Sequence, residues 1–318
     1  MKNTEQQIQN IKEAYNFGVE VEMYGITREE ASKLASNYFG TGRYADTANT
    51  NGLETWSAYD SLNREWQFSL DCSILGQKSE KCELITPVLE YSDIPVLQEL
   101  LQILRHHGAI SNPSFGCGVH VHVSRKDGFA VQDIKNLVNI MASHENQLAK
   151  AINVDESRLD EYCQMVEQDF LELLHTRKLQ TMADLEDAWY KTNCDDDSPD
   201  IRRRHYNRSR YHMLNLHSLF HGHKTVEFRL FQFANPTEER QGGIDTDEMK
   251  TFVQLCLAMC ELAHQVKYAS AIPQQDENEK YAFRCWLLRL GFIGEEFKTA
   301  RRILLRNMEG NCAWRRVS

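Results

Sequence analysis

The sequence lacks the features that mark membrane, exported and nucleic-acid-binding proteins. Its longest uncharged apolar run falls well short of the roughly 18 residues that a membrane span requires. The first residues, Met-Lys-Asn-Thr-Glu-Gln-Gln, contain no apolar signal core. The 36 lysines and arginines are outnumbered by 46 aspartates and glutamates, and the net charge of −10 disfavours broad binding to a phosphate backbone. We therefore expect a protein that binds neither a membrane nor nucleic acid.

Paired cysteines are also missing, although the chain has nine cysteines. The count is odd, and no two cysteines follow the C-x-x-C spacing of a zinc ribbon or a redox pair. Cys256 and Cys260 lie four apart in an apolar segment, which is typical of one buried helix face. Without a signal core, this pattern favours a reducing, cytoplasmic location.

Three familiar catalytic loops are absent from the sequence. The glycine-rich stretch at residues 114–118 is not followed by the G-K-[ST] of a Walker A loop, and no G-x-G-x-x-G lies between a predicted strand and a helix. No G-x-S-x-G elbow occurs, so a serine hydrolase is not indicated.

The remaining composition is that of a globular protein, with 42% hydrophobic and 26% charged residues. Hydrophobic periodicity predicts strands at residues 17–23, 54–59, 66–71, 82–86, 119–124, 211–216 and 225–231. It predicts helices at residues 5–15, 28–40 and 94–107, through most of 130–192, and from about 247 onward. Because strand-rich stretches flank a helical insertion and do not repeat as βαβ units, we expect an α+β fold. The predicted domains are residues 1–245, with the insertion at about 130–192, and a helical region at 246–318 packed on the first domain.

Two glutamates share one face of the first predicted strand. Glu20 and Glu22 alternate with Val19 and Val21, so the carboxylates and the valines lie on opposite faces. Like charges on one face repel unless a cation lies between them or both face water. This motif alone leaves both a cation site and a solvated edge strand open.

Two histidines have the same arrangement farther along the chain. His120 and His122 lie on one face of a predicted strand, and valines lie on the other. Imidazoles two residues apart converge on a small volume, which suits a metal or a phosphate-bearing ligand. A single histidine on such a face is usually structural. The pair after a glycine-rich turn favours a site.

A third strand carries Glu227 and Arg229 opposite Val226, Phe228 and Leu230. The simplest reading is a surface ion pair of little energetic value. Other predicted strands, however, also present acids or imidazoles opposite an apolar face. Such a polar face is costly unless divalent cations neutralise it, and carboxylates with one imidazole favour Mg²⁺ or Mn²⁺ over structural zinc. The acids and the imidazole on these polar faces are Glu20, Glu22, Glu83, His120 and Glu227.

A basic segment precedes the last strand pair. Residues 202–204 are three arginines that can simply form a solvated loop beside the preceding aspartates. Arg208 and Arg210 run directly into the strand predicted at 211–216 and are better candidates for recognising an anion. His217, His221 and His223 are expected in a polar turn.

Taken in chain order, these motifs resemble those of the amidoligase family. Its members are carboxylate–amine ligases related to glutamine synthetase and glutamate–cysteine ligase. The resemblance covers about residues 17–231. The matching segments are Phe-Gly-Val-Glu-Val-Glu at 17–22, Asp-Cys-Ser at 71–73, Glu-Leu-Ile-Thr-Pro at 83–87, Gly-Cys-Gly-Val-His-Val-His-Val-Ser at 116–124, Arg-Tyr-His-Met-Leu-Asn at 210–215 and Thr-Val-Glu-Phe-Arg at 225–229.

The resemblance implies an enzyme that uses ATP to join a carboxylate to an amine through an acyl phosphate. Its expected fold is a glutamine-synthetase-like, curved, mainly antiparallel sheet with flanking helices. It further implies that His122 and Ser124 contact the nucleotide and that two or three Mg²⁺ or Mn²⁺ ions are held by Glu20, Glu22, Glu83, His120 and Glu227. Arg229 would contact the transferring phosphoryl group, and Arg210, with Arg208, the phosphate or the substrate carboxylate. The amine and carboxylate could be small molecules, peptides or protein side chains.

Two other functions remain open from the sequence. One is a metal-dependent hydrolase that uses the His120/His122 pair, although such a site usually needs more imidazole ligands and an aspartate base. The other is a non-catalytic binding protein that retains the fold. The sequence also departs from the family at Cys72, where glycine is common. If that turn required a positive φ, a metal role for Asp71 would be in doubt.

Overall fold

The computed structural model describes residues 2–48, 54–176, 179–194, 196–204, 206–237, 242–273 and 277–313. Its contacts divide the chain into two compact units. The sheet unit comprises residues 16–121 and 231–250, and the helical unit comprises residues 1–15, 122–230 and 251–318. These units interleave along the sequence. The domain boundary expected at residue 245 stays a prediction.

The sheet unit is built on antiparallel strands. They follow the hydrogen-bonded order β2-β3-β4-β5-β1-β6, and the pairs β2·β3, β3·β4, β4·β5 and β1·β5 are all antiparallel. Inward side chains such as Val19, Val21, Phe68 and Leu84 are completely or almost completely buried. The strands are β1 (Tyr15–Tyr24), β2 (Tyr44–Asp46), β3 (Thr55–Tyr59), β4 (Glu65–Ser69), β5 (Lys81–Ile85) and β6 (Val119–Arg125).

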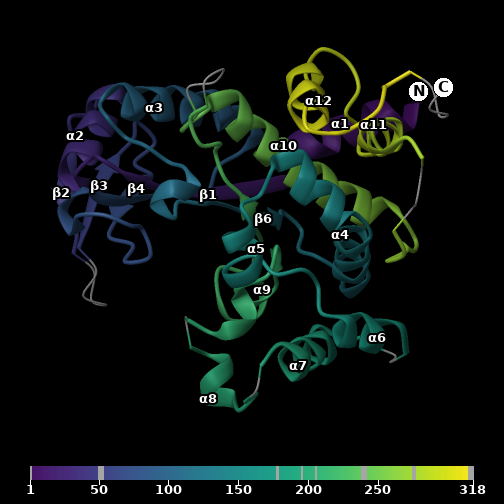
Figure 1. Cartoon of the computed structure of the whole chain (residues 1–318). Coiled ribbons are helices and arrows are strands. Elements are labelled where there is room, and N and C mark those ends of the chain that lie inside the picture. The colour runs from purple at the N-terminus through teal and green to yellow at the C-terminus, as the bar shows by residue number, and fades with distance from the viewer. Residues whose placement is uncertain are drawn as a thin grey trace. The chain divides into compact units, whose positions relative to one another are not determined.

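Two helices accompany these strands, α2 (Arg28–Tyr38) and α3 (Ile94–His106) (Figure 1). The side chain of Thr27 caps α2 by accepting a hydrogen bond from the Glu30 N–H. α2 packs against β3 and β4 and against α3. Short 3₁₀ turns, η1 (Lys78–Glu80), η2 (Tyr91–Asp93) and η3 (Pro113–Phe115), connect the strands and helices.

The helical unit contains most of the helices and one strand pair. β7 (Leu214–Asn215) is antiparallel to β8 (Val226–Phe231), and the strand order here is β6-β8-β7. α4 contacts α6 and α12, and α6 contacts α7. The helices are α1 (Lys2–Glu13), α4 (Val131–Ile152), α5 (Glu156–Glu161), α6 (Gln168–Thr176), α7 (Met182–Asn193), α8 (Pro199–Arg202), α9 (His217–His221), α10 (Thr246–Gln265), α11 (Glu279–Arg289) and α12 (Lys298–Leu305).

The expected mixture of helices with antiparallel strands is confirmed. The strand predicted at residues 211–216 is wrong in extent, because only β7 is extended there. Arg208 and Arg210 form the 3₁₀ turn η4 (Arg208–Arg210) instead of leading into a strand. The cause is local: the Asn207 side chain accepts the Ser209 N–H, which bends the backbone.

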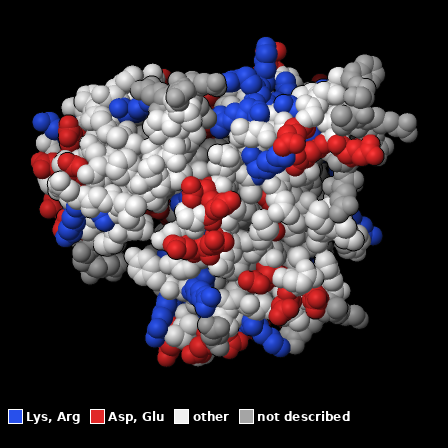
Figure 2. Space-filling model, viewed as in Figure 1, with Lys and Arg blue, Asp and Glu red and all other residues white. Residues whose placement is uncertain are grey.

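Two further observations concern the surface. Within the part of the chain that is described, no helix is both long enough and apolar enough to cross a bilayer. Figure 2 shows basic and acidic side chains on the same face, in several places next to each other, with broad uncharged surface elsewhere.

One acid inside the helical unit is unusual. Glu145, on α4, is only 5% exposed, and its Oε1 accepts a hydrogen bond of 2.7 Å from the Val166 N–H. Burial outweighs this hydrogen bond and raises the pKa of Glu145 to about 7. In the unfolded chain the carboxyl would ionise near its ordinary value of 4.5. Between these values the folded state holds the extra proton, so stability falls as pH rises through that window.

We predict that Glu145→Gln removes this loss of stability. An amide resembles the neutral acid and can still accept the Val166 N–H. The variant and the wild type should therefore have similar unfolding free energies at pH 5, and the variant should be more stable at pH 8 by up to roughly 3 kcal/mol. Denaturant unfolding at pH 5, 6, 7 and 8 measures this, with exposed Glu156→Gln as the control. Parallel pH profiles for wild type and Glu145→Gln would contradict it.

Candidate active site

The first group of functional side chains forms where β1 and β5 pair. Their register places Glu22 directly opposite Glu83, so the two carboxylates share one face of the sheet. Glu20 lies on the same face of β1, one alternation away from Glu22. The opposite face carries Val19 and Val21, which are buried in the core. The predicted alternation of acids and valines is confirmed.

His120 joins these acids from β6. Its Nδ1 lies 2.8 Å from Glu20 Oε2, and its Nε2 lies 3.9 Å from Glu22 Oε1. Glu22 is fixed in turn by the Gly118 N–H, which donates to its Oε2 at 2.6 Å. The glycine-rich turn therefore brings its backbone directly to a carboxylate of this group.

Asp71 completes the group from the end of β4. Its Oδ1 accepts hydrogen bonds from both the backbone N–H and the hydroxyl of Ser73, each at 2.7 Å. Cys72 is not among the residues with a positive φ, so cysteine is compatible with this turn. Asp71 is thus held in place beside Glu22 and Glu83. We refer to the five residues Glu20, Glu22, Asp71, Glu83 and His120 as the carboxylate cluster.

The donor set of the carboxylate cluster fits a hard divalent cation. One ligand atom each from Glu20, Glu83 and His120 lie within 4.8 Å of one another, and the same holds for Glu22, Asp71 and Glu83. The two sets share Glu83, so it can serve two adjacent ions. Carboxylate oxygens suit Mg²⁺ and Mn²⁺, and a cation removes the repulsion between neighbouring carboxylates.

A second group lies on β8 in the helical unit. Glu227 and Arg229 form an ion pair between Arg229 NH1 and Glu227 Oε1, and the two residues are 2% and 5% exposed. All six residues of β8 are buried, so the simpler interpretation of Glu227 and Arg229 as a surface ion pair is wrong. The register with β7 puts Asn215 opposite Glu227, and Asn215 donates to Glu227 Oε2 at 2.7 Å. A buried pair of this kind holds its geometry far better than an exposed one.

Arg229 has further contacts at both its side chain and its backbone. Its guanidinium lies 5.8 Å from the centre of the Tyr211 ring. Arg158, which is 4% exposed, donates to the Arg229 backbone carbonyl oxygen at 3.1 Å and so holds the main chain of β8. A planar guanidinium in this position can bind two oxygens of an anion at once.

His122 approaches Glu227 from the helical-unit half of β6. Its Nε2 lies 3.9 Å from Glu227 Oε2. Its Nδ1 lies 3.0 Å from the Thr225 hydroxyl, which is itself 2.9 Å from the Ser218 hydroxyl. Ser124 follows His122 on the same strand face and is half-buried.

The two predicted anion-binding arginines occupy η4. Arg208 is exposed, whereas Arg210 is half-buried with its guanidinium 5.6 Å from the centre of the Tyr206 ring. Of the histidines expected in a polar turn, His221 and His223 are exposed at the end of α9 and in the bend after it, whereas His217 differs from the expectation. His217 is 7% exposed and begins the short helix α9, and its Nδ1 contacts the Tyr190 hydroxyl at 2.5 Å.

Sequence reasoning missed the groups that position the others. Asn215 and Thr225 lie inside or next to the recognised motifs, yet only the β7·β8 register and the fold around β6 give them roles. The signal that could have indicated Asn215 is its position as the polar last residue of the segment 210–215, which precedes the strand of Glu227. Ser218 offered no signal in the sequence.

Comparison with known proteins bears on both groups. The family model described as a putative amidoligase enzyme matches residues 13–260. That range includes the carboxylate cluster, the Glu227–Arg229 pair and their supporting residues. No curated protein matches the chain.

We predict opposite effects of Glu83→Gln with and without divalent cation. Without metal, the substitution removes one of two facing charges and should raise stability by a few tenths of a kcal/mol to about 1 kcal/mol. With Mg²⁺ at about 100 times its Kd, the wild type should gain about 2.7 kcal/mol, and the variant much less. Thermal unfolding with EDTA and with Mg²⁺ measures both effects, with the exposed Glu29→Gln as the matched control. An equal Mg²⁺ gain in wild type and Glu83→Gln would contradict the metal assignment.

Proposed function

The chain belongs to the putative amidoligase enzyme family, and from this premise we propose that it is an ATP-dependent ligase that joins a carboxylate to an amine. The observation that carries the proposal is the carboxylate cluster, in which four acids and one imidazole converge from β1, β4, β5 and β6. A surface of this charge is suited to divalent cations that accompany a nucleoside triphosphate.

The proposed reaction has two steps. A carboxylate oxygen of the first substrate forms a bond to the terminal phosphorus of ATP as the bond to ADP breaks, which yields an acyl phosphate. The nitrogen of the amine then forms a bond to the acyl carbon as phosphate leaves, and the nitrogen loses a proton. Both steps build negative charge on phosphate oxygens, so catalysis consists mainly of positioning and charge neutralisation.

In this proposal Glu20, Glu22, Glu83, His120 and Glu227 hold two or three Mg²⁺ or Mn²⁺ ions, and Asp71 adds a further carboxylate. Such ions, when bound, neutralise phosphate oxygens and orient the triphosphate. Glu20 keeps His120 in place through its 2.8 Å contact, and the Gly118 N–H does the same for Glu22. These second contacts make the ligands rigid before anything binds.

Arg229 would contact the transferring phosphoryl group. Its pair with Glu227 and its place beside Tyr211 support the role, because both restrict the guanidinium to one plane. His122 and Ser124 would contact the nucleotide, with Thr225 fixing the His122 ring. Arg210, and Arg208 beside it, would bind the phosphate or the carboxylate of the first substrate.

The proposal also covers the fold of the sheet. It does not favour the alternative of a metal-dependent hydrolase. We propose that the antiparallel strands form the curved active-site wall of glutamine-synthetase-like ligases. A zinc hydrolase would need several imidazoles on one ion. Among the residues that the structure describes, each group of three ligand atoms within 4.8 Å of one another contains at most one histidine.

Hydroxylamine provides a test that does not require the natural amine. It traps an acyl phosphate as a hydroxamate, so a panel of amino acids, peptides and small carboxylic acids can be screened with ATP, Mg²⁺ and hydroxylamine. The proposal predicts that a subset of carboxylates gives hydroxamate together with an equal amount of ADP, and that EDTA abolishes both products. ADP release that no carboxylate stimulates, or metal-independent hydrolysis of amides, would contradict it.

For the active carboxylate, we predict that Arg229→Lys lowers the rate of hydroxamate formation by roughly 10²- to 10³-fold. Lysine keeps the positive charge beside Glu227, so the fold should survive, but it cannot present two parallel N–H groups. Arg229→Ala is less informative, since it leaves Glu227 buried without its cation. Exposed Arg204→Lys is the matched control. A loss of tenfold or less in Arg229→Lys would move the role to another residue.

A further inference from the structure

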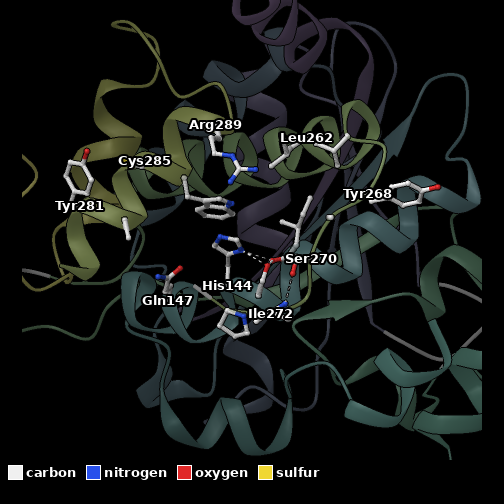
Figure 3. Close-up of a pocket in the computed structure, with 16 residues that line it drawn as sticks. His144, Gln147, Leu262, Tyr268, Ser270, Ile272, Tyr281, Cys285 and Arg289 are labelled. Atoms are coloured by element: carbon white, nitrogen blue, oxygen red, sulfur yellow. Dashed lines mark hydrogen bonds between the residues drawn. The ribbon is translucent and has the colours of Figure 1, made fainter. Parts of the chain in front are cut away.

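A cavity of about 830 Å³ lies in the helical unit, between α4, α11 and the segment that follows α10 (Figure 3). It shares no residue with the carboxylate cluster or with the Glu227–Arg229 pair. Its volume is in the range of sites that hold small organic molecules. The proposed ligase chemistry gives this cavity no role.

One wall of the cavity is an ordered aromatic stack. The rings of His144 and Trp286 are 4.1 Å apart and inclined by 19°. Trp286 also stacks on Phe283, with ring centres 5.2 Å apart. Trp286 and Phe283 are 6% and 0% exposed, so the wall is rigid.

His144 offers a hydrogen-bond acceptor to the cavity. Its Nδ1 lies 2.9 Å from the Ile140 carbonyl oxygen, which can only accept, so Nδ1 carries the ring proton. Burial lowers the pKa of His144 to about 4, and the ring is neutral near pH 7. The Nε2 atom therefore has a lone pair, and no residue in the described ranges donates a hydrogen bond to it. The Nδ1 side of the ring also contacts the Ser143 hydroxyl at 2.8 Å.

Arg289 supplies a positive charge at the same cavity. It lies on the last turn of α11, and its guanidinium is near enough to oppose protonation of His144. The side chain is exposed, and its guanidinium forms no ion pair or hydrogen bond with any residue that the structure describes. Figure 3 shows Arg289 on the same side of the cavity as the aromatic stack.

The rest of the lining is mainly apolar. Ile140, Leu262, Val266 and Ile272 contribute aliphatic side chains, and Ile272 is 77% exposed. A ligand with an apolar body would cover this surface and remove it from water.

We propose that this cavity binds a small organic carboxylate whose apolar body carries an N–H or O–H group. The carboxylate binds the Arg289 guanidinium, the N–H or O–H donates to His144 Nε2, and the body packs against Ile140, Leu262 and the aromatic stack. An unionised acceptor beside a cation selects for a donor and an anion in one molecule.

Indole-3-propionate has this chemistry and serves as the probe, because it combines an apolar ring system, one N–H and one carboxylate. Its binding to the full chain is measured by isothermal titration calorimetry. Two probes each lack one group: 3-phenylpropionate has no N–H, and 3-methylindole has no carboxylate. The inference predicts that indole-3-propionate binds most tightly and that both others bind at least several-fold more weakly.

Variants locate the site. Arg289→Gln should weaken indole-3-propionate roughly 10-fold or more and leave 3-methylindole unchanged. Ala282→Phe, which fills the cavity, should weaken all three probes. Arg284→Gln, on the same helix but outside the lining, is the matched control, and circular dichroism checks that each variant is folded.

Cysteine modification gives a second readout that does not depend on affinity alone. Cys285 lines the cavity, whereas the exposed Cys72 does not. Bound indole-3-propionate should slow the reaction of N-ethylmaleimide with Cys285, followed by peptide mass spectrometry, and leave Cys72 unaffected.

Three results would overturn the inference. They are an absence of binding by all three probes at several millimolar, equal indole-3-propionate affinity in wild type and Arg289→Gln, and a change from dimer to monomer in Ala282→Phe by light scattering. The last result would mean that a second copy of the chain covers the cavity. None of these results depends on ligase activity, so the inference and the proposed function can fail separately.

Discussion

The carboxylate cluster is built around one unfavourable interaction, the repulsion between Glu22 and Glu83 at directly facing positions of β1 and β5. Two like charges at facing positions of an antiparallel pair destabilise the sheet. Two further acids of the cluster, Glu20 and Asp71, add to the negative charge, while the Gly118 N–H donates a hydrogen bond to Glu22. We propose that a divalent cation stabilises this concentration of carboxylates.

The rest of the cluster follows from this constraint. Glu22 faces Glu83 across the β1–β5 pair, and its Oε2 accepts a hydrogen bond from the Gly118 N–H. His120 is fixed by Glu20, so the imidazole cannot turn away from the acids. The side chains of the cluster are therefore positioned by the register of β1 and β5, by the turn before β6 and by the contact between His120 and Glu20.

The Glu227–Arg229 pair differs from the carboxylate cluster because its charges are opposite and attract each other. Here a buried acid is matched by a buried cation and by the Asn215 amide, so its charge is satisfied within the protein. Burying the pair costs desolvation free energy, but it also holds the guanidinium in the fixed position that recognition of an anion requires. We propose that the two groups are complementary, with the carboxylate cluster recruiting cations to a polyphosphate and Arg229 binding its oxygens directly.

Much of the cluster could be predicted from the sequence, and the reasons are physical. Strict alternation fixes which face of a strand a residue occupies, so Glu20, Glu22, His120 and His122 were assigned to their faces correctly. Alternation cannot report what covers the other face, and β8 proved to be buried on both sides. It also cannot report register between strands, which alone places Asn215 opposite Glu227. The turn at Arg208–Arg210 was not predicted, because it depends on the Asn207 side chain accepting the Ser209 N–H, which hydrophobic periodicity does not report.

The most direct test of this account is a calorimetric titration of the chain with a non-hydrolysable ATP analogue, with Mg²⁺ and after its removal by chelation. The account predicts that binding requires Mg²⁺ and that it weakens in Glu227→Gln, whose amide cannot serve as an anionic ligand. Binding of equal strength without Mg²⁺, or no binding at millimolar analogue, would contradict the claim that these carboxylates form a metal–nucleotide site.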